Sequence, residues 1–466
     1  NGEIYNHLKK INNIKKRQNK ELLSKSNSDT FTMLALIEEL GIKKTLSLIQ
    51  GMFSLAVYFF KENNLFLIRD HFGQKPLFYT YENEKFIFGS EIKSLLLLKD
   101  KSLSIDKTSI ALPFLQTRLP DSDRTIFKSI HQVLPGELIV INKKLNLKRE
   151  SYFEPSNLIS EDLYNFYDRC NEKVLIERYS LTLEKSISNH LISDVPVGTL
   201  FSAGLDCSII AKKAEDFGSK YRVGFKTNTG EDDKYYSSFD SESISDTNFY
   251  TNNEEEEIIN LPKLLYMYEA INKPDGLILS SLTEKARKEG LRVLLNGDAS
   301  DELFCGYQTF TDLYHKSSIL DSPMKKITIK VFRKLFPEIF NMSIYDDSLL
   351  NFYNFSPNQI ELLEPYLDVF QYKESNIKFW YECLNKFDFI KSKKEKFLMA
   401  FSVNEFSKRL PRYLHRSDSY GMMNSVEMRA PFLDLEFVKL ALNTPLRYKI
   451  NKNTVRIKNP LVNKYI

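Results

Sequence analysis

The chain has 466 residues, of which 42% are hydrophobic, and a formal net charge of +4. This length allows two separate hydrophobic cores, and the nearly balanced charge argues against nucleic-acid binding as the main function. Two basic stretches, residues 9–17 and 391–396, lack the interleaved aromatic side chains of a nucleotide-stacking surface and are interpreted as solvated helix faces. No apolar run approaches the roughly 18 to 20 residues of a membrane span, and no signal peptide is visible in the sequence given.

Short strand patterns dominate the chain up to about Tyr152, with few helices between them. This pattern predicts an antiparallel, layered α+β domain. A polar segment at residues 154–162 is interpreted as a linker, after which helical periodicity and parallel-type strands predict an α/β domain. The expected domains are residues 1–155 and 170–466. The strand patterns of the first domain include residues 54–60, 65–68 and 137–141.

A first polar loop, Ser-Ala-Gly-Leu-Asp-Cys-Ser, occupies residues 202–208. It follows an apolar run and precedes a helical stretch, which predicts a strand, a tight turn and a helix N-terminus. Such a turn presents backbone N–H groups and a helix dipole to an anion of the size of pyrophosphate, and Asp206 is placed to hold a divalent metal. An ordinary strand-to-helix connection with a serine cap is the alternative.

A second polar loop follows the buried-strand pattern at residues 291–295 and extends from 296 to 307. Three of its carboxylates, those of Asp298, Asp301 and Glu302, crowd the end of that strand. Acidic groups packed so closely repel each other unless a cation or an ammonium group neutralises them, which makes Asp301 a second metal ligand beside Asp206. The alternative is a helix N-terminus whose acids complement the dipole.

Together the two loops resemble those of the glutamine-hydrolysing asparagine synthetases. In that family, Ser-Gly-Gly-Leu-Asp-Ser-Ser is followed by Gly-Glu-Gly-Ser-Asp-Glu and an aromatic-Gly-Gly-Tyr segment. Residues 415–422 and 426–434 resemble the family's later Asp-x-x-Ser-Met and Glu-x-Arg-x-Pro-Phe-Leu-Asp motifs. The likeness covers nearly the whole chain in the same order. It implies an ATP-pyrophosphatase domain with a parallel sheet, similar to the adenine nucleotide hydrolases.

The first third resembles the glutaminase half of the same family, which has an N-terminal-nucleophile fold of layered antiparallel sheets. There an amino-terminal Cys attacks the glutamine carboxamide, with its own α-amine as base. The resemblance places Asn1 and Gly2 in the oxyanion hole, and Glu3 and Asp29 at the glutamine amino group. Because residue 1 is Asn, we expect an incomplete domain whose nucleophile lies upstream. The motifs that carry this resemblance are residues 1–6, 51–56, 69–77 and 88–93.

None of the cysteines supplies a terminal thiol, and their spacing predicts neither a zinc site nor a disulfide framework. Free thiols in a protein of this size indicate a reducing, cytoplasmic location. The four cysteines are Cys170, Cys207, Cys305 and Cys383.

The resemblance further implies a reaction in which Mg²⁺ bridges Asp206 and Asp301. The β-carboxylate of aspartate attacks the α-phosphorus of ATP, which gives a β-aspartyl adenylate and pyrophosphate. Ammonia from glutamine then gives asparagine and AMP. Asp298 matches the family's general base, and Lys458 matches a lysine that stabilises developing charge. The implied ATP-binding residues are Phe201, Ser202, Ala203, Gly204, Leu205, Asp206, Cys207, Ser208, Val223, Asn296 and Gly297.

Several residues depart from the family pattern. Ala203 replaces a loop glycine, and Cys207 replaces a serine hydroxyl by a weaker donor. Asp298 is one methylene shorter than the family's Glu. Asn296 stands in place of a Ser, and Val462 stands where the family usually has Arg.

Three functions fit these observations. The first is asparagine synthesis. The second is ATP-dependent amidation of another carboxylate, since the departures lie on the acyl-acceptor side of the site. The third is a catalytically inert homologue that acts as a binding protein. The expected partners are the small molecules aspartate, glutamine and ATP, with no nucleic acid and no membrane, and the resemblance allows a homodimer.

Overall fold

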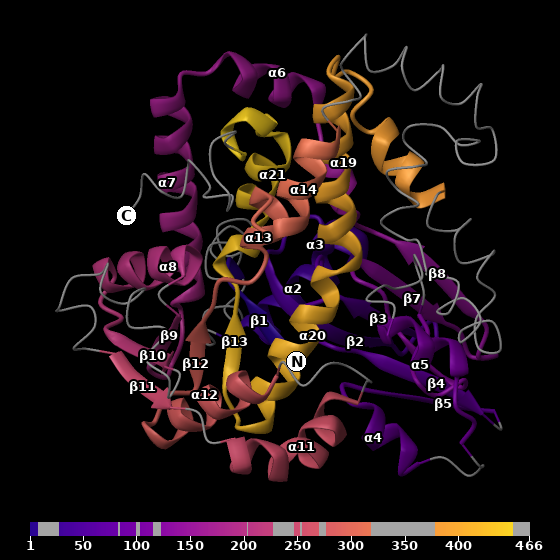
Figure 1. Ribbon diagram of the computed structural model, residues 1–466. Helices are drawn as coiled ribbons and strands as arrows, with labels where there is room; N and C mark the ends of the chain where they lie inside the picture. Colours follow the sequence, from indigo (N-terminus) through magenta and orange to yellow (C-terminus); the bar gives the residue numbers. More distant parts are fainter. Residues whose placement is uncertain are drawn as a thin grey trace, which may run out of the picture.

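Two antiparallel sheets form the amino-terminal part of the chain in the computed structural model (Figure 1). The structure describes residues 1–7, 28–82, 84–98, 103–114, 123–202, 204–226, 247–251, 254–269, 276–317 and 378–450. The first sheet has the strand order β1-β2-β3-β7-β8, and the second has the order β5-β4-β6. The strands are β1 (Gly2–Ile4), β2 (Gly51–Phe59), β3 (Asn64–Arg69), β4 (Phe78–Glu82), β5 (Lys85–Gly89), β6 (Ile130–Gln132), β7 (Glu137–Ile141) and β8 (Leu147–Ser151).

Side-chain alternation in the first sheet produces the layers of this part. Leu67 and Ile68 are neighbours in β3 and are both fully buried, but they belong to different cores. Ile68 joins the core beneath helix α2, whereas Leu67 packs with Leu77 and Tyr79 toward the second sheet. The predicted layered, antiparallel architecture is therefore confirmed. The helices of this part are α2 (Asp29–Leu40), α3 (Ile42–Leu46), α4 (Ile92–Leu96) and α5 (Lys107–Phe114).

A five-stranded parallel sheet organises the rest of the chain, as predicted. Its order is β11-β10-β9-β12-β13, with β9 (Val197–Phe201), β10 (Tyr221–Lys226), β11 (Thr247–Thr251), β12 (Val293–Leu295) and β13 (Glu427–Arg429). The order reverses between β9 and β12. In open parallel sheets, ligands bind outside the carboxyl ends of the strands at such a reversal.

Helices pack on both faces of the parallel sheet (Figure 1). The largest hydrophobic core lies among α7, α19 and α21 and includes Trp380, Phe397 and Phe437. The helices are α6 (Glu161–Arg169), α7 (Glu172–His190), α8 (Leu205–Asp216), α11 (Glu254–Tyr268), α12 (Leu277–Lys288), α13 (Ser300–Phe304), α14 (Gln308–Lys316), α19 (Lys393–Lys408), α20 (Leu410–Met423) and α21 (Leu435–Asn443), with 3-10 turns η2 (Pro155–Leu158), η4 (Pro431–Leu433) and η5 (Leu446–Tyr448).

The segment interpreted as a linker is held against α21. Asn443 of this helix donates its side-chain N–H to the carbonyl of Leu158 at 2.9 Å, and its Oδ1 accepts from the backbone N–H of Ser160 at 2.7 Å. Ser160 in turn caps the start of α6. The connection between the two parts is thus anchored by specific hydrogen bonds.

Two further properties concern the molecule as a whole. All four cysteines are free. Among the helices that the structure describes, none is both long enough and apolar enough to cross a lipid bilayer.

Candidate functional site

The two predicted polar loops meet at the carboxyl ends of β9 and β12. These strands pair directly, so the loops leave the sheet side by side. The Ser300 hydroxyl donates to Oδ1 of Asp206 at 2.7 Å, which ties the second loop to the first. A Cβ atom at Gly297 would stand 3.1 Å from the Asp206 Cβ, so the loops are close-packed here. The structure therefore brings together the residues that the sequence assigned to one site.

The carboxylates of Asp206 and Asp301 repel each other at this meeting point. Burial, together with the nearby charge of Asp301, raises the pKa of Asp206 to about 7. Burial also raises the pKa of Asp301; Asp298 acts in the same direction, and the guanidinium of Arg409 opposes it. Within the described ranges, no group of three or more His, Cys, Asp or Glu side chains gathers as a metal site. Two carboxylates still fit Mg²⁺, because this ion commonly binds one or two carboxylates and completes its shell with water and substrate phosphates.

The first loop leads from β9 into helix α8, and the hydroxyls of Ser202 and Ser208 both form local hydrogen bonds. The backbone N–H of Gly204 donates to the Ser202 hydroxyl at 3.3 Å, and α8 begins at the next residue. Ser208 donates its hydroxyl to the Gly204 carbonyl at 2.8 Å, inside the first turn of the helix. Burial raises the pKa of Cys207 to about 11, so its thiol remains protonated at neutral pH. Ala203 lies outside the described residues.

Asp298 is held in a fixed orientation. Its Oδ2 accepts hydrogen bonds at 2.7 Å from the side chains of Asn296 and Ser417. Asn296, which departs from the family's Ser, thus acts as a local anchor for this carboxylate. Ser417 comes from α20, more than a hundred residues away along the chain, and the sequence reasoning missed it.

The third carboxylate of the second loop does not join the pair formed by Asp206 and Asp301. Glu302 is buried, and its Oε1 accepts from the Tyr307 hydroxyl at 2.6 Å. Burial raises the pKa of Glu302 to about 8. Gly306 is required nearby, because a Cβ atom there would stand 1.8 Å from Oδ1 of Asp301. Glu302 is therefore a structural residue, and Gly306 leaves room for Asp301.

Two non-glycine residues in this loop adopt left-handed backbone angles. Ala299 has φ 79° and Cys305 has φ 60°. Both stand where the resembled motifs have Gly, and the sequence reasoning did not single them out as departures. Both departures can be read from the sequence: Ala299 matches the third position of Gly-Glu-Gly-Ser-Asp-Glu, and Cys305 matches the second position of aromatic-Gly-Gly-Tyr.

The side chains of the remaining predicted nucleotide-binding residues are buried. Phe201 is buried, and Val223 is completely buried in a core with Leu282 and Leu294. A nucleotide at this edge of the sheet would therefore meet the main chain of Val223 and not its side chain. Lys458 and Val462 lie outside the described residues.

The four predicted glutamine-binding residues lie together at the start of the first sheet. Asp29 begins α2, and its Oδ2 accepts from the backbone N–H of Ile4 at 3.2 Å. Burial raises the pKa of Glu3, and the nearby charge of Asp29 contributes in the same direction. Gly2 has φ 119°, and a Cβ there would overlap the Met52 carbonyl. The carboxylates of Glu3 and Asp29 are thus close enough for their charges to interact.

Buried ion pairs of Glu3 and Lys75 join the amino-terminal part to the parallel-sheet part of the chain. Arg429, at the end of β13, contacts Glu3 at 3.4 Å and Glu427 at 2.7 Å. Lys75 extends from the amino-terminal part to Asp418 of α20, with Nζ 2.8 Å from Oδ1. Burial alone would lower the pKa of Lys75, but the charges of Asp418 and Glu427 raise it. The sequence contained these residues within recognised motifs but gave no indication that they pair.

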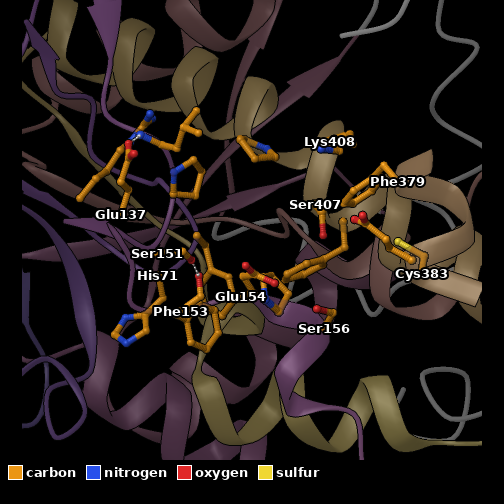
Figure 2. Close-up of a pocket in the computed structure, with 18 of the residues that line it drawn as sticks. His71, Glu137, Ser151, Phe153, Glu154, Ser156, Phe379, Cys383, Ser407 and Lys408 are labelled. Atoms are coloured by element: carbon orange, nitrogen blue, oxygen red, sulfur yellow. Dashed lines mark hydrogen bonds between the residues drawn. The ribbon is translucent and has the colours of Figure 1, made fainter. Parts of the chain in front are cut away.

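A separate pocket of about 490 Å³ lies between the two parts of the chain (Figure 2). None of the predicted ATP-binding or glutamine-binding residues lines it, so the proposed chemistry is placed at the loops described above. Side chains from both parts contribute to its wall, among them His71, Glu137, Ser151, Phe153, Phe379, Cys383 and Lys408.

Comparison with known proteins matches both parts of the chain to families. The model of the asparagine synthase family matches residues 178–462, and that of the glutamine amidotransferase domain matches residues 1–153. The chain belongs to the asparagine synthase family. Its amino-terminal part is a glutamine amidotransferase domain, and the resemblance seen in the sequence is confirmed.

Individual relatives within the family are distant. The glutamine-hydrolysing asparagine synthetase 1 of Bacillus subtilis is 25% identical over 98% of this chain and 71% of its own length. The corresponding enzyme 2 of the same organism is 31% identical over 66% of this chain and 42% of its own length. An amidase of Penicillium rubens is 24% identical over 66% of this chain and 47% of its own length. The chain thus spans about half the length of the second and third relatives.

Proposed function

We propose that this family member converts L-aspartate to L-asparagine with ATP and with ammonia derived from glutamine, releasing AMP and pyrophosphate. The observation that carries the proposal is the meeting of Asp206, Asp301 and a helix N-terminus at the switch point between β9 and β12. In this proposal, residues 1–155 form the glutamine amidotransferase domain and residues 170–466 form the ATP-pyrophosphatase domain.

Activation of aspartate takes place at the two loops. Residues 202–208 hold the pyrophosphate portion of ATP through backbone N–H groups at the start of α8. Asp206 and Asp301 would hold Mg²⁺, which would supply positive charge to neutralise the phosphates. The β-carboxylate of aspartate attacks the α-phosphorus, the bond to the bridging oxygen breaks, and pyrophosphate leaves. The product of this step is the β-aspartyl adenylate.

Ammonia then attacks the acyl carbon, and AMP leaves. Asp298 accepts the excess proton, and its orientation is fixed because Asn296 and Ser417 both donate to Oδ2. Lys458 is assigned to stabilise the developing negative charge. At the other site, Asn1 and Gly2 form the oxyanion hole, and Glu3 and Asp29 bind the glutamine α-ammonium group. Ammonia passes between the two sites inside the protein.

The test is to identify the products made from ATP. With Mg²⁺ and L-aspartate, the protein is expected to release pyrophosphate and AMP, with ammonium salts as nitrogen source. Asp206→Asn is expected to lower this rate by roughly 10²-fold or more, because an amide oxygen does not replace a charged metal ligand. Asp312→Asn, at an exposed position on α14, is the matched control and should keep the rate. Release of ADP and orthophosphate would contradict the proposal.

A second candidate function is the amidation of another carboxylate by the same adenylation chemistry. It is supported by the departure from the family pattern at Asp298, the residue proposed to accept the proton when ammonia attacks the acyl carbon. If a different carboxylic acid triggers pyrophosphate release and aspartate does not, this second function replaces the first. If no acid triggers release, the protein is an inert homologue.

A further inference from the structure

The short helix α4 of the amidotransferase domain takes its N-terminal cap from the other domain. The residue at its own cap position, Glu91, makes no capping hydrogen bond through its side chain. Instead Glu269, directly after α11, accepts the backbone N–H groups of Ile92 at 2.6 Å and of Lys93 at 2.7 Å. Two otherwise unpaired helix donors are thereby satisfied by a single carboxylate from the parallel-sheet domain. Figure 1 shows α11 beside α4.

The position of the Glu269 carboxylate is strongly determined. Its side chain is only 6% exposed, and it also contacts Nζ of Lys93 at 3.3 Å. Its backbone has φ 55°, a left-handed conformation that is unfavourable for a residue with a side chain. A buried, charged group with three donors around it is expensive to disturb, because losing the donors leaves the charge uncompensated.

The capped end of α4 lies next to the predicted oxyanion hole. Ser90 stands two residues before Ile92, and its hydroxyl accepts from the side-chain N–H of Asn1 at 3.3 Å. Asn1 is the residue whose amide is proposed to donate to the glutamine carbonyl oxygen. The chain of contacts therefore runs from Glu269 through the start of α4 and Ser90 to this amide.

Glu269 is also connected, through Tyr268, to helix α20 near the proposed adenylation site. The carbonyl of Tyr268, which precedes Glu269, is 3.0 Å from Nε2 of His415 on α20. Tyr268 also stacks on Tyr420 of the same helix, with ring centroids 5.7 Å apart. Helix α20 carries Ser417, which holds Asp298. Glu269 is thus fixed to the helix that orients the proposed general base.

We propose that Glu269 is a positioning residue of the glutamine site, supplied by the synthetase domain, that holds the amide of Asn1 in place through α4 and Ser90. This inference rests on the proposed function, since it needs glutamine to bind at Asn1. The contact of Glu269 with α4 makes the carboxamide half of the glutamine site dependent on the docking of the synthetase domain. The amino-acid half, at Glu3 and Asp29, does not depend on Glu269.

The experiment compares two ligands by calorimetric titration of the whole 466-residue protein. L-Glutamine uses both halves of the site, whereas L-norvaline lacks the carboxamide and uses only the amino-acid half. Glu269→Gln is expected to weaken glutamine binding about three- to tenfold, as the loss of charge-assisted hydrogen bonds does, and to leave norvaline binding within about twofold. Glu91→Gln removes the exposed ion pair of Glu91 with Lys93 but keeps the cap, so it is the matched control and should bind both ligands normally.

Ser90→Ala keeps the inference testable if Glu269→Gln does not fold. It should weaken glutamine binding selectively as well, and the double variant should be less than additive because both residues act on one amide. If Glu269→Gln weakens the binding of both ligands equally, or leaves glutamine binding unchanged, the inference is overturned while the proposed function stays in place. Absence of glutamine binding by the unaltered protein would instead overturn the glutamine site of the proposed function, and this inference with it.

Discussion

Backbone strain in the second loop is concentrated at Ala299 and Cys305. Both residues carry a Cβ atom in a left-handed conformation, which costs roughly 1–2 kcal/mol for an L-residue. Helix α13, which lies between them, carries Asp301, and Asp298 immediately precedes Ala299. Strain of this kind persists only where the surrounding structure enforces it. Here the strand pairing of β12, the Ser300 hydrogen bond and the packing of Gly306 against Asp301 provide that enforcement.

Ala299→Gly is therefore expected to stabilise the protein. Glycine relieves the unfavourable φ of 79°, although it also gains more freedom in the unfolded chain. Loss of the buried Ala299 methyl group offsets a further part of this gain, so the net expected gain in the free energy of unfolding is at most about 0.5 kcal/mol. The control is Ala35→Gly within helix α2, where the same change should cost about 1 kcal/mol. Urea denaturation of the three proteins measures the difference; a loss of stability in Ala299→Gly would contradict the strain argument.

Helix α20 connects three parts of the molecule through neighbouring turns. His415 contacts the end of α11, Ser417 holds Asp298, and Asp418 pairs with Lys75 of the amidotransferase domain. These residues are close in sequence, so the helix cannot shift at one contact without disturbing the others. The motif at residues 415–422 therefore connects the two domains to each other and to Asp298.

The buried pair of Lys75 and Asp418 gives a prediction at this scale. Lys75→Met leaves the buried carboxylate of Asp418 without its cation, and the expected cost is about 3–5 kcal/mol of stability. Lys43→Met, which removes an exposed ion pair with Glu150, is the control and should cost less than about 1 kcal/mol. The midpoint of chemical denaturation distinguishes them. Equal effects of the two substitutions would show that burial of Lys75 has no energetic consequence.

At the scale of the whole molecule, the sequence predicted the two architectures and the meeting of the two loops. Those features depend on local patterns: continuous apolar runs at β9 and β12, short alternating strands before Tyr152, and polar residues after each parallel strand. The predicted strands at residues 54–60, 65–68 and 137–141 correspond to β2, β3 and β7. The roles of the individual site residues stay predictions.

Contacts between distant segments could not be predicted in the same way. The pairing of Arg429 with Glu3 joins residues 426 positions apart, and the pairing of Lys75 with Asp418 joins residues 343 positions apart. Neither pair has a local signature, because a charged side chain in a motif has the same letter whether it faces solvent or a partner. The buried orientation of the Glu302 side chain was not predicted for the same reason. The three acids of the second loop suggested one cluster, but the short helix α13 directs Glu302 to Tyr307 instead.

The interface of the two domains also contains a buried histidine that must stay neutral in the folded protein. His190 is buried, its Nδ1 lies 2.8 Å from the Ser186 carbonyl, and its ring packs 4.0 Å from the ring of Tyr5. Burial lowers the pKa of His190 to about 3, and the neighbouring charge of Arg429 acts in the same direction. In the unfolded chain, the pKa of a histidine is about 6.5. Between these two values the unfolded state binds one more proton at this position than the folded state does.

This difference sets the sign of a pH dependence. The stability that a neutral His190 contributes is fully present above pH 6.5 and is lost as the pH falls toward 3, by about 1.4 kcal/mol per pH unit. His190→Gln keeps an N–H donor for Ser186 and removes the titrating group. Between pH 6.5 and pH 5, the stability of the variant should therefore fall by about 2 kcal/mol less than that of the unaltered protein. Other titrating groups, including Asp206, Glu302 and His71, are present in both proteins and cancel in the difference. Denaturation midpoints at several pH values provide the measurement, and parallel curves for the two proteins would show that the pKa of His190 is the same in the folded and unfolded states.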